Sequence, residues 1–317
     1  MSSAVQDDDR FARPGEPPML VNALVRLPWG VKRWIWSRPT MWRYFASICR
    51  RLGWSEESLG VYRANNGPFA DIGVRAIHTN HLWAAMGGYE PDVSEWMTRA
   101  FADPAWFGDN RDVFDVGAYF GMLALLFAKH AERVVAFEPS PANREALERN
   151  LAVNPSLAGR VHVRPFAVSD REGSVEMTFD GVQSTNQIKT EGVRLWSNAE
   201  NLPVTTAKTI PLDAMIDETP DGLPWRPGFI KIDVEGAEGL VLAGVSETLR
   251  RFRPSLLVET HNDDACATVF DELRAANYTT FRLESGRLRH AVGAWPGGYG
   301  HVAAIPSERA SGAKVIQ

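Results

Sequence analysis

Acidic side chains placed beside short apolar runs are the first residues of this sequence that could do chemistry. Asp115 lies in an apolar run that leads into a glycine turn, Gly117 to Gly121, and Glu138 ends the next apolar run, 23 residues after Asp115. Apolar runs of this length are typical of buried parallel strands. An acid at the tip of the second strand is where a doubly wound sheet binds the two hydroxyls of a ribose. The pattern therefore predicts a site for an adenosine-containing cofactor.

The spacing of the two glycines distinguishes the candidate cofactors. A dinucleotide turn needs the pattern G-x-G-x-x-G, which lets a pyrophosphate approach the backbone. Here the spacing is Gly117-x-x-x-Gly121, and Asp115 lies two residues before the first glycine. A carboxylate there would repel a pyrophosphate, but it suits a ligand with an ammonium group and a sulfonium. S-adenosylmethionine is such a ligand, and an ordinary βα turn is the structural alternative.

Two further apolar runs end in residues that could move a proton. Asp233 and Glu235 follow one run, and Glu259 and His261 end the other. The carboxyl ends of parallel strands meet at one edge of a sheet, so we expect these four side chains to converge. Crowded carboxylates have shifted pKa values, and the reference pKa of histidine is ~6.5, so any of the four could act as general base.

Four motifs that follow one another in the chain carry a resemblance to a known family. They are Asp-Val-Gly-Ala-x-x-Gly from Asp115, Ala-Phe-Glu-Pro-Ser-Pro around Glu138, Lys-Ile-Asp-Val-Glu-Gly-Ala-Glu ending at Glu238, and Val-Glu-Thr-His ending at His261. The set resembles the FkbM family of S-adenosylmethionine-dependent methyltransferases over residues 113–261. The resemblance implies a Rossmann-like class I methyltransferase α/β fold. Its sheet is mostly parallel with an antiparallel last strand, and helices cover both faces. Family members usually carry Asn where this sequence has Tyr119.

The expected site residues fall into a cofactor group and a catalytic group. The third strand and its exit are expected in residues 160–170, and in this fold the loop leaving that strand covers the adenine, although strand-end packing would explain the same residues. The predicted cofactor contacts are Asp115, Gly117, Ala118, Tyr119, Gly121, Glu138, Phe166, Ala167 and Asp170. The predicted catalytic residues are Asp233, Glu235, Glu259 and His261.

A hard cation is an alternative to a side-chain base. Asp233 and Glu259, at adjacent strand ends, offer oxygen ligands, and Mg²⁺ with retained waters could polarise a sugar hydroxyl. Mg²⁺ is therefore a second candidate cofactor. Lys231 is expected to pair with a nearby acid, and Glu238 to lie in the first turn of a helix, where the helix dipole favours an acid.

Composition sets limits on the class of protein. With 317 residues and 44% hydrophobic content, the chain can bury one catalytic core with an N-terminal appendage. Its 34 basic and 39 acidic residues give a net charge of −5, so nothing global suggests a nucleic-acid binder. Cys49 and Cys266 lie far apart, and buried inert thiols are expected. The acidic N-terminus is unlike a secretory signal, and no apolar run approaches ~20 residues, so we expect a cytoplasmic protein.

The expected organisation is a tail, a cap and a catalytic domain. The ranges are a disordered tail (1–18), a Trp-rich helical and β-hairpin cap (19–90), a Rossmann-like methyltransferase domain (91–306) with an insertion roofing the active site (171–228), and a loose tail (307–317). Residues 19–55 hold seven basic residues among five tryptophans and no acid. A helix from Ser37 to Gly53 is expected to cap the catalytic domain or to rest on anionic lipid as a peripheral membrane contact. Asp92, Ser140, and Asp263 or Asp264 are predicted helix caps.

The function implied by the resemblance is O-methylation. The acceptor would be a hydroxyl of a sugar, glycolipid or polyketide-like metabolite, either free or lipid-linked. An NAD-dependent oxidoreductase is the alternative enzyme, against which the missing third glycine argues, and a membrane-docked binding module is the non-catalytic alternative. A nucleic-acid methyltransferase is disfavoured because the Asp-Val-Glu-Gly end of the fourth strand lacks a proline-aromatic pair. The sequence does not indicate an oligomeric state.

Overall fold

The computed structural model divides the chain into two compact units, residues 1–89 and 90–317. It describes residues 26–38, 61–75, 87–178, 186–189, 201–218 and 222–313, together with residues 23, 44, 47, 84 and 193. In the first unit it describes α2 (Trp29–Trp36), β1 (Val61–Arg63) and β2 (Gly73–Arg75). β1 and β2 pair antiparallel, as the predicted hairpin requires. The predicted tail (1–18) and most of the predicted helix from Ser37 to Gly53 lie outside the described residues, and α2 precedes the position predicted for that helix.

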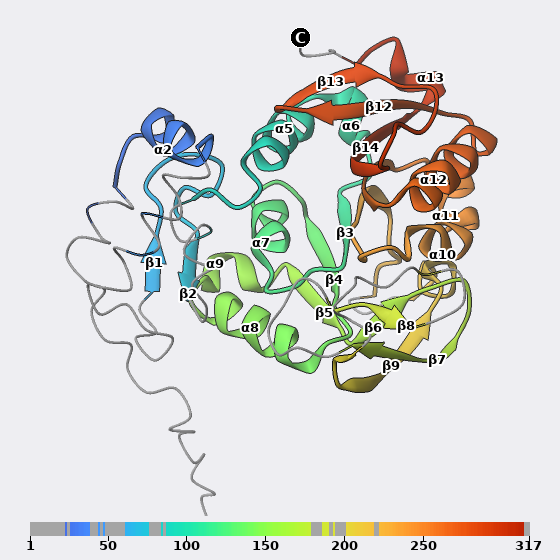
Figure 1. The fold of residues 1–317 in the computed structure, drawn as a ribbon, viewed down its shortest axis with the longest axis horizontal. Coiled ribbons are helices and arrows are strands. Elements are labelled where there is room, and N and C mark those ends of the chain that lie inside the picture. The colour runs from blue at the N-terminus through green and yellow to red at the C-terminus, as the bar shows by residue number, and fades with distance from the viewer. Residues whose placement is uncertain are drawn as a thin grey trace, which may run out of the picture. The chain divides into compact units, whose positions relative to one another are not determined.

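An eight-stranded sheet forms the centre of the second unit (Figure 1). Its strands, in spatial order, are β13 (Arg287–His290), β12 (Tyr278–Glu284), β14 (Tyr299–Pro306), β11 (Ser255–His261), β10 (Pro227–Ile232), β3 (Asp112–Val116), β4 (Arg133–Phe137) and β5 (Val161–Arg164). The strands from β11 to β5 are parallel, and β14 enters antiparallel between β11 and β12. This arrangement confirms the predicted class I methyltransferase sheet.

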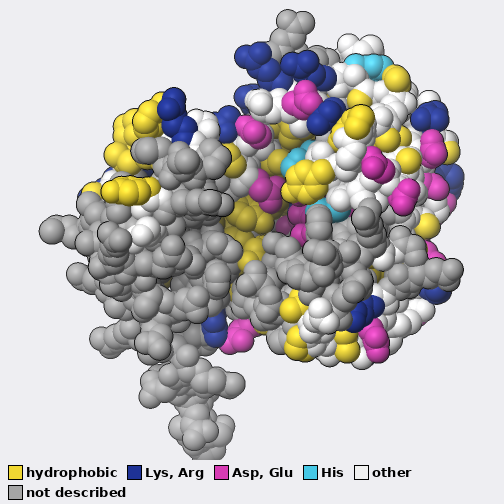
Figure 2. Space-filling model, viewed as in Figure 1, with side chains coloured by type: hydrophobic (Ala, Val, Ile, Leu, Met, Phe, Trp, Pro, Cys, Tyr) yellow, Lys and Arg dark blue, Asp and Glu magenta, His cyan; other side chains and the backbone are white. Residues whose placement is uncertain are grey.

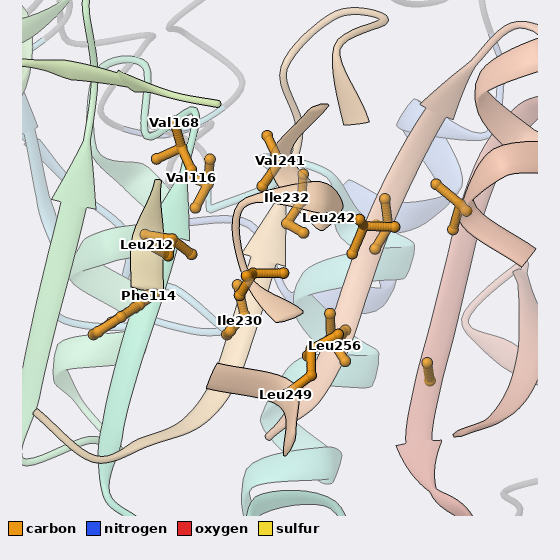
Figure 3. Close-up of a cluster of buried hydrophobic side chains, with 14 of the residues drawn as sticks. Phe114, Val116, Val168, Leu212, Ile230, Ile232, Val241, Leu242, Leu249 and Leu256 are labelled. Atoms are coloured by element: carbon orange, nitrogen blue, oxygen red, sulfur yellow. The ribbon is translucent and has the colours of Figure 1, made fainter. Parts of the chain in front are cut away.

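Helices cover both faces of this sheet because successive side chains of a strand point to opposite faces. The helices are α5 (Pro91–Phe101), α6 (Pro104–Phe107), α7 (Met122–Ala128), α8 (Pro141–Ala152), α9 (Pro155–Ala158), α10 (Glu238–Ala243), α11 (Ser246–Phe252), α12 (Asp263–Ala275) and α13 (Ser307–Ala310). Ile230 and Ile232 of β10 join a core with Val241 and Leu249 of α10 and α11 (Figure 3). Phe229, which precedes Ile230 and points to the other face, contacts aromatic rings of α5 and α7 instead.

The predicted start of α8 is confirmed, whereas that of α5 is wrong. The Ser140 hydroxyl accepts a hydrogen bond from the Asn143 amide, 3.4 Å away, and so caps α8. The helix α5 already begins at Pro91, and Asp92 therefore lies in its first turn and is not its cap. Proline suits that first position because its missing N–H would have no helical partner there.

The predicted cap of α12 is also wrong. Asn262 is the N-cap, and its side-chain oxygen accepts from the Ala265 amide at 2.8 Å. Asp263 and Asp264 lie in the first turn, where the helix dipole favours acids. Sequence patterns of this kind mark the helix start to within one or two residues, because Asn and Asp are both good caps.

The insertion contributes three strands to a separate four-stranded sheet, whose order is β6-β9-β7-β8. Its strands are β6 (Phe166–Val168), β9 (Val204–Ile210), β7 (Gly173–Thr178) and β8 (Ile188–Lys189), and a 3₁₀ turn, η3 (Leu212–Ala214), follows. The sequence predicted β7 and β9 but placed residues 160–170 in one strand with its exit. The chain instead breaks at Pro165, which has no N–H to give to a ladder, and β6 leaves the main sheet to pair parallel with β9.

The C-terminal segment is more ordered than predicted. Residues 307–310 form α13, and Glu308 makes an ion pair with Arg253 at 2.9 Å, whereas the sequence predicted a loose tail from residue 307. Residues 314–317 lie outside the described part. Cys266 is a buried free thiol, as expected, and Cys49 falls among the undescribed residues. Across the described helices, none combines the length and the apolar character needed to cross a membrane.

Candidate active site

Strand register brings the predicted residues into one row at the carboxyl edge of the sheet. The last residues of β3, β4 and β10 pair with one another, and they are followed directly by Gly117, Glu138 and Asp233. Glu259 of the neighbouring strand β11 is the next residue in this row. His301 of β14 pairs with Glu259 across the antiparallel junction. Figure 2 shows acidic and histidine side chains gathered in a hollow on one face of the molecule. The expected convergence at one sheet edge is therefore present in the structure.

The turn after β3 requires both of its glycines. Gly117 has φ +82°, and a Cβ built there would lie 1.8 Å from the carbonyl oxygen of Asp233. Gly121 has φ +83°, and a Cβ there would lie 2.7 Å from a leucine side chain of α8. The amides of Gly117 and Ala118 both donate to the carbonyl of Phe137, at 3.0 Å each. The turn is thereby held against β4 and pressed against the end of β10.

Glu138 braces the same turn. One of its carboxylate oxygens accepts the Tyr119 amide at 2.8 Å, and the other accepts the Ser140 amide at 2.9 Å and the Asn143 side chain at 3.2 Å. Burial raises the pKa of Glu138 to about 7 although these hydrogen bonds oppose the rise. Tyr119 has φ +52°, a conformation that Asn tolerates better than Tyr. Because a carboxylate offers about four lone-pair sites, Glu138 keeps acceptor capacity for ribose hydroxyls.

Asp115 is a buried carboxylate whose oxygens are poorly satisfied by the described residues. Its side chain is fully buried, and neither oxygen finds a donor with hydrogen-bond geometry among the described residues. Burial raises its pKa to about 6, and the charge of Lys231 opposes the rise. Leaving such a group unsatisfied is costly. The ammonium group of S-adenosylmethionine would satisfy it, so the residues present fit that ligand.

Lys231 is a buried cation that faces the acids of this edge. Its ammonium lies 2.9 Å from Asp233, and the pairing expected from the sequence is confirmed. Burial would lower the pKa of Lys231, but the charges of Asp233, Asp115 and Glu90 raise it above the ordinary value. Lys231 therefore stays charged and compensates part of the negative charge.

His261 is oriented by a carboxylate that the sequence assigned only to the helix dipole. Its Nδ1 lies 2.9 Å from Glu238, a fully buried residue at the start of α10. The other ring nitrogen lies 3.5 Å from Glu235 and 3.6 Å from Asp233. Burial opposes protonation, but the hydrogen bond and charge of Glu238 outweigh it and raise the pKa of His261 to about 9. The pairing leaves Nε2 directed at the predicted catalytic acids.

Three residues of this cluster were missed by the sequence analysis. His301 Nε2 lies 3.3 Å from Glu259 and 4.0 Å from Glu90, and the Tyr299 ring lies 5.8 Å from the His261 ring. Burial raises the pKa of Glu90 to about 7, whereas His301, against the effect of burial, lowers that of Glu259 to about 2. No local motif marks these residues, because the antiparallel pairing of β14 and the start of α5 bring them in from distant parts of the chain.

Two sets of side chains have the spacing of metal ligands. They are Asp233, Glu259 and His261, and Glu90, Glu259 and His301, with ligand atoms within 4.8 Å of one another. Each set includes an imidazole, whereas Mg²⁺ prefers oxygen ligands in octahedral geometry. A cation there would also compete with the Lys231 ammonium and with the proton of His261. The donor sets therefore fit Mg²⁺ poorly.

The predicted adenine contacts lie on and after β6. Ala167 is packed in the small core of the insertion sheet, beside Met177 and Ala237, and Phe166 is half-buried. Asp170 accepts from the Ser169 hydroxyl at 3.0 Å and pairs with Arg171 at 3.1 Å. It also lines a cavity of about 330 Å³. The Ala167 side chain thus serves packing, whereas the cofactor roles of Phe166 and Asp170 stay predictions.

The insertion touches the catalytic edge through Gln187. This side chain is 1% exposed and donates to the carbonyl of Glu235 at 2.5 Å. Glu235 has φ +57°, so its backbone is held in a conformation unusual for a side chain of this size. Gln187 therefore supports the turn that carries the predicted catalytic acids.

Comparisons with known proteins show which family this chain resembles. Residues 115–280 match the model of the methyltransferase FkbM domain. The chain is 34% identical over 193 residues to the 31-O-demethyl-FK506 methyltransferase FkbM of Streptomyces tacrolimicus. This alignment covers 53% of this chain and 72% of that protein. It is 29% identical over 151 residues to the hexuronic acid methyltransferase AglP of Haloferax volcanii, covering 47% and 55%. The crystal structure of a methyltransferase FkbM from Methylobacillus flagellatus KT aligns with 84% of this chain and 71% of its own, at 15% identity and a TM-score of 0.41.

Proposed function

This chain belongs to the FkbM methyltransferase family, and from that membership we propose that it transfers the methyl group of S-adenosylmethionine to a hydroxyl of a small molecule. The acceptor would be a sugar, a glycolipid or a polyketide-like metabolite. One relative is named for 31-O-demethyl-FK506 and another for hexuronic acid, and both names support a hydroxyl-bearing acceptor. Family membership argues against the oxidoreductase and the non-catalytic binding module.

The fully buried Asp115 carboxylate, which meets no donor with full hydrogen-bond geometry among the described residues, carries the proposal for the donor. Glu138 lies at the tip of the next strand, where ribose hydroxyls bind in this fold. The two acids flank the Gly117 turn, so one would hold the ammonium end of the donor and the other its ribose. The two carboxylates would repel the pyrophosphate of a dinucleotide.

His261 is the best-placed base for the acceptor hydroxyl. A carboxylate only accepts hydrogen bonds, so the ring proton shared with Glu238 sits on Nδ1 and the lone pair sits on Nε2 when the ring is neutral. The hydroxyl proton would move to Nε2 while the oxygen attacks the methyl carbon and the sulfur leaves with the bonding electrons. Holding the two reactants in line supplies about 7 to 11 kcal/mol. A pKa of about 9 limits the neutral form of the free enzyme, and the positive donor would lower that pKa by charge repulsion.

Isothermal titration and labelled methyl transfer test the proposed function. We expect S-adenosylmethionine to bind and NADH to give no heat of binding. Incubation with methyl-labelled donor and a cell extract should then place the label on oxygen of a small molecule, identified by mass spectrometry. Label found on nucleic acid, on protein or on nitrogen would contradict the proposal, as would the absence of donor binding.

A peripheral membrane contact through residues 19–55 is also proposed. The basic, Trp-rich composition of this segment supports it. Sedimentation with anionic liposomes should be lost when residues 1–55 are removed and should weaken with salt. Equal sedimentation of both proteins would contradict the proposal.

A further inference from the structure

Tyr299 is an exposed aromatic residue at the margin of the acid and histidine cluster. It is 59% exposed, and its ring meets the His261 ring edge-on, with centroids 5.8 Å apart. Burial of the hydroxyl, followed by the charge of Glu259, raises its pKa above the ordinary value. The polar end of the side chain therefore lies toward the carboxylates, while the apolar ring stays accessible to a ligand.

The backbone around Tyr299 is held in place. The Thr260 hydroxyl lies 2.5 Å from the carbonyl oxygen of Gly298 and 3.1 Å from that of Gly300. The Trp295 indole donates to the Tyr299 carbonyl at 3.0 Å. Gly298 has φ +62°, and a Cβ there would lie 2.2 Å from neighbouring backbone. An exposed ring on a fixed backbone is preorganised for contact, because little conformational entropy is lost when a ligand packs on it.

Carboxylates outnumber cationic side chains around Tyr299. The described carboxylates of this edge are Glu90, Asp115, Asp233, Glu235, Glu238 and Glu259, and the cations that face them are Lys231, His261 and His301. S-adenosylmethionine would add one net positive charge, which leaves the site negative. Two like charges 4 Å apart repel by about 4 kcal/mol at an effective dielectric constant of 20. An acceptor with its own carboxylate or phosphate would therefore be disfavoured.

We propose that the acceptor packs a ring against Tyr299 and that this acceptor carries no negative charge. A ring alcohol has apolar C–H faces and a polar edge of hydroxyls. With one face on the phenol ring, an edge hydroxyl would lie beside His261, and other hydroxyls could donate to the carboxylates. This inference rests on the proposed function and narrows it, because it separates this chain from a methyltransferase of uronic acids.

Two matched sugars provide the test. Methyl β-D-glucopyranoside and methyl β-D-glucuronide differ in one carboxylate, and their binding to the full chain saturated with S-adenosylhomocysteine can be measured by saturation-transfer NMR. We expect the neutral glucoside to bind about tenfold or more tightly than the glucuronide. Tyr299→Ala should weaken glucoside binding about tenfold, and Tyr299→Phe, which keeps the ring, should bind it nearly as well. Absent glucoside binding, or tighter binding of the glucuronide, would overturn the proposal.

The control variant lies in the loop that leads into β14. Val292 is 74% exposed, and Val292→Ala should leave glucoside binding unchanged. S-adenosylhomocysteine binding, measured on each variant, should stay at the wild-type value if Tyr299 contacts only the acceptor. Equal glucoside binding by Tyr299→Ala and wild type would refute the role of Tyr299 while leaving the proposed function intact. Loss of donor binding and of methyl transfer in the wild type would instead refute the proposed function itself.

Discussion

The two sides of the site differ in how their negative charge is compensated. The donor side consists of Asp115, the Gly117–Gly121 turn and Glu138. There Glu138 accepts from amides, Asp115 meets no donor with full hydrogen-bond geometry among the described residues, and burial raises the pKa of both. The acceptor side consists of the ends of β10, β11 and β14. There each of three acids lies near a cation, as in the pairs Asp233–Lys231, Glu238–His261 and Glu259–His301.

This difference shows which side needs a charged ligand. Negative charge on the acceptor side is partly balanced within the protein, so that side is arranged for moving protons. On the donor side the positive charge would come from S-adenosylmethionine itself. Because that ligand would bind only the folded chain, it should also stabilise the fold by mass action.

The largest expected effect on stability and donor binding comes from replacing Gly117, which lies where the donor side contacts the acceptor side. In Gly117→Ala the new Cβ would meet the Asp233 carbonyl oxygen at 1.8 Å, and the backbone would keep a φ of +82° that alanine rarely adopts. We expect a loss of roughly 3 kcal/mol or more in the free energy of unfolding, together with loss of donor binding. Denaturant unfolding would measure it. The matched control is Gly159→Ala, where nothing lies within 4 Å, and equal stability of the two variants would contradict the prediction.

Asp115→Asn separates ligand binding from stability. Donor affinity should fall about 10- to 100-fold, since a hydrogen bond to a charged group contributes ~1.5–3 kcal/mol. The free protein should become more stable at pH 7, by about 3 kcal/mol at most, because the mutation removes a buried carboxylate whose ionisation is unfavourable.

The pH dependence of that gain follows from the raised pKa of Asp115. The folded pKa of about 6 exceeds the ordinary 3.8, so ionisation costs stability that is lost as pH rises between these values. The gain in Asp115→Asn should therefore be absent below pH 4 and complete above pH 6. Thermal melting below pH 4 and above pH 6 would measure the change in stability, and titration calorimetry would measure the change in donor affinity. Unchanged donor affinity would place the ammonium of the donor elsewhere.

Glu238→Gln should change the acceptor side alone. The wild-type kcat/KM for the donor, which reports the free enzyme, should rise with pH up to a plateau above about 9, because the base must be neutral and Glu238 holds the pKa of His261 near that value. Without the carboxylate the midpoint should fall toward ~6.5, and the plateau rate should fall about tenfold as the ring loses its orientation. Donor affinity should stay unchanged. A pH–rate profile with the wild-type midpoint would exclude His261 as the base.

The sequence predicted the donor side more fully than the acceptor side. Asp115 lies in β3, and Gly117 and Glu138 directly follow the neighbouring parallel strands β3 and β4, so their spacing along the chain follows from strand, turn and helix lengths. Their mutual contacts were less predictable, since the hydrogen bond from the Tyr119 amide to Glu138 depends on a positive φ that no motif specifies. Local patterning determines which elements form but not how their atoms meet.

The acceptor side depends on pairing between distant segments. Glu259 and His301 lie opposite each other because β14 inserts antiparallel between β11 and β12, and a shift of one residue in that register would turn His301 to the other face of the sheet. The role of Glu238 was underestimated for a similar reason. The helix dipole explains an acid at that position equally well without His261 nearby.

The smallest effect should come from the insertion, and it tests whether the acceptor side is supported from outside the main sheet. Gln187→Ala removes the side-chain hydrogen bond to the part-buried Glu235 carbonyl, which costs about 1 kcal/mol. The Glu235 turn should loosen, so kcat should fall severalfold while donor affinity stays at the wild-type value, because the Gln187 side chain donates to a carbonyl of the acceptor side. Lys189→Ala, two residues further along the chain and only half-buried, is the matched control. Steady-state kinetics with titration calorimetry would measure both quantities. A loss of donor affinity equal to the loss in kcat would mean that the insertion supports the two sides together, and the separation between them would then fail.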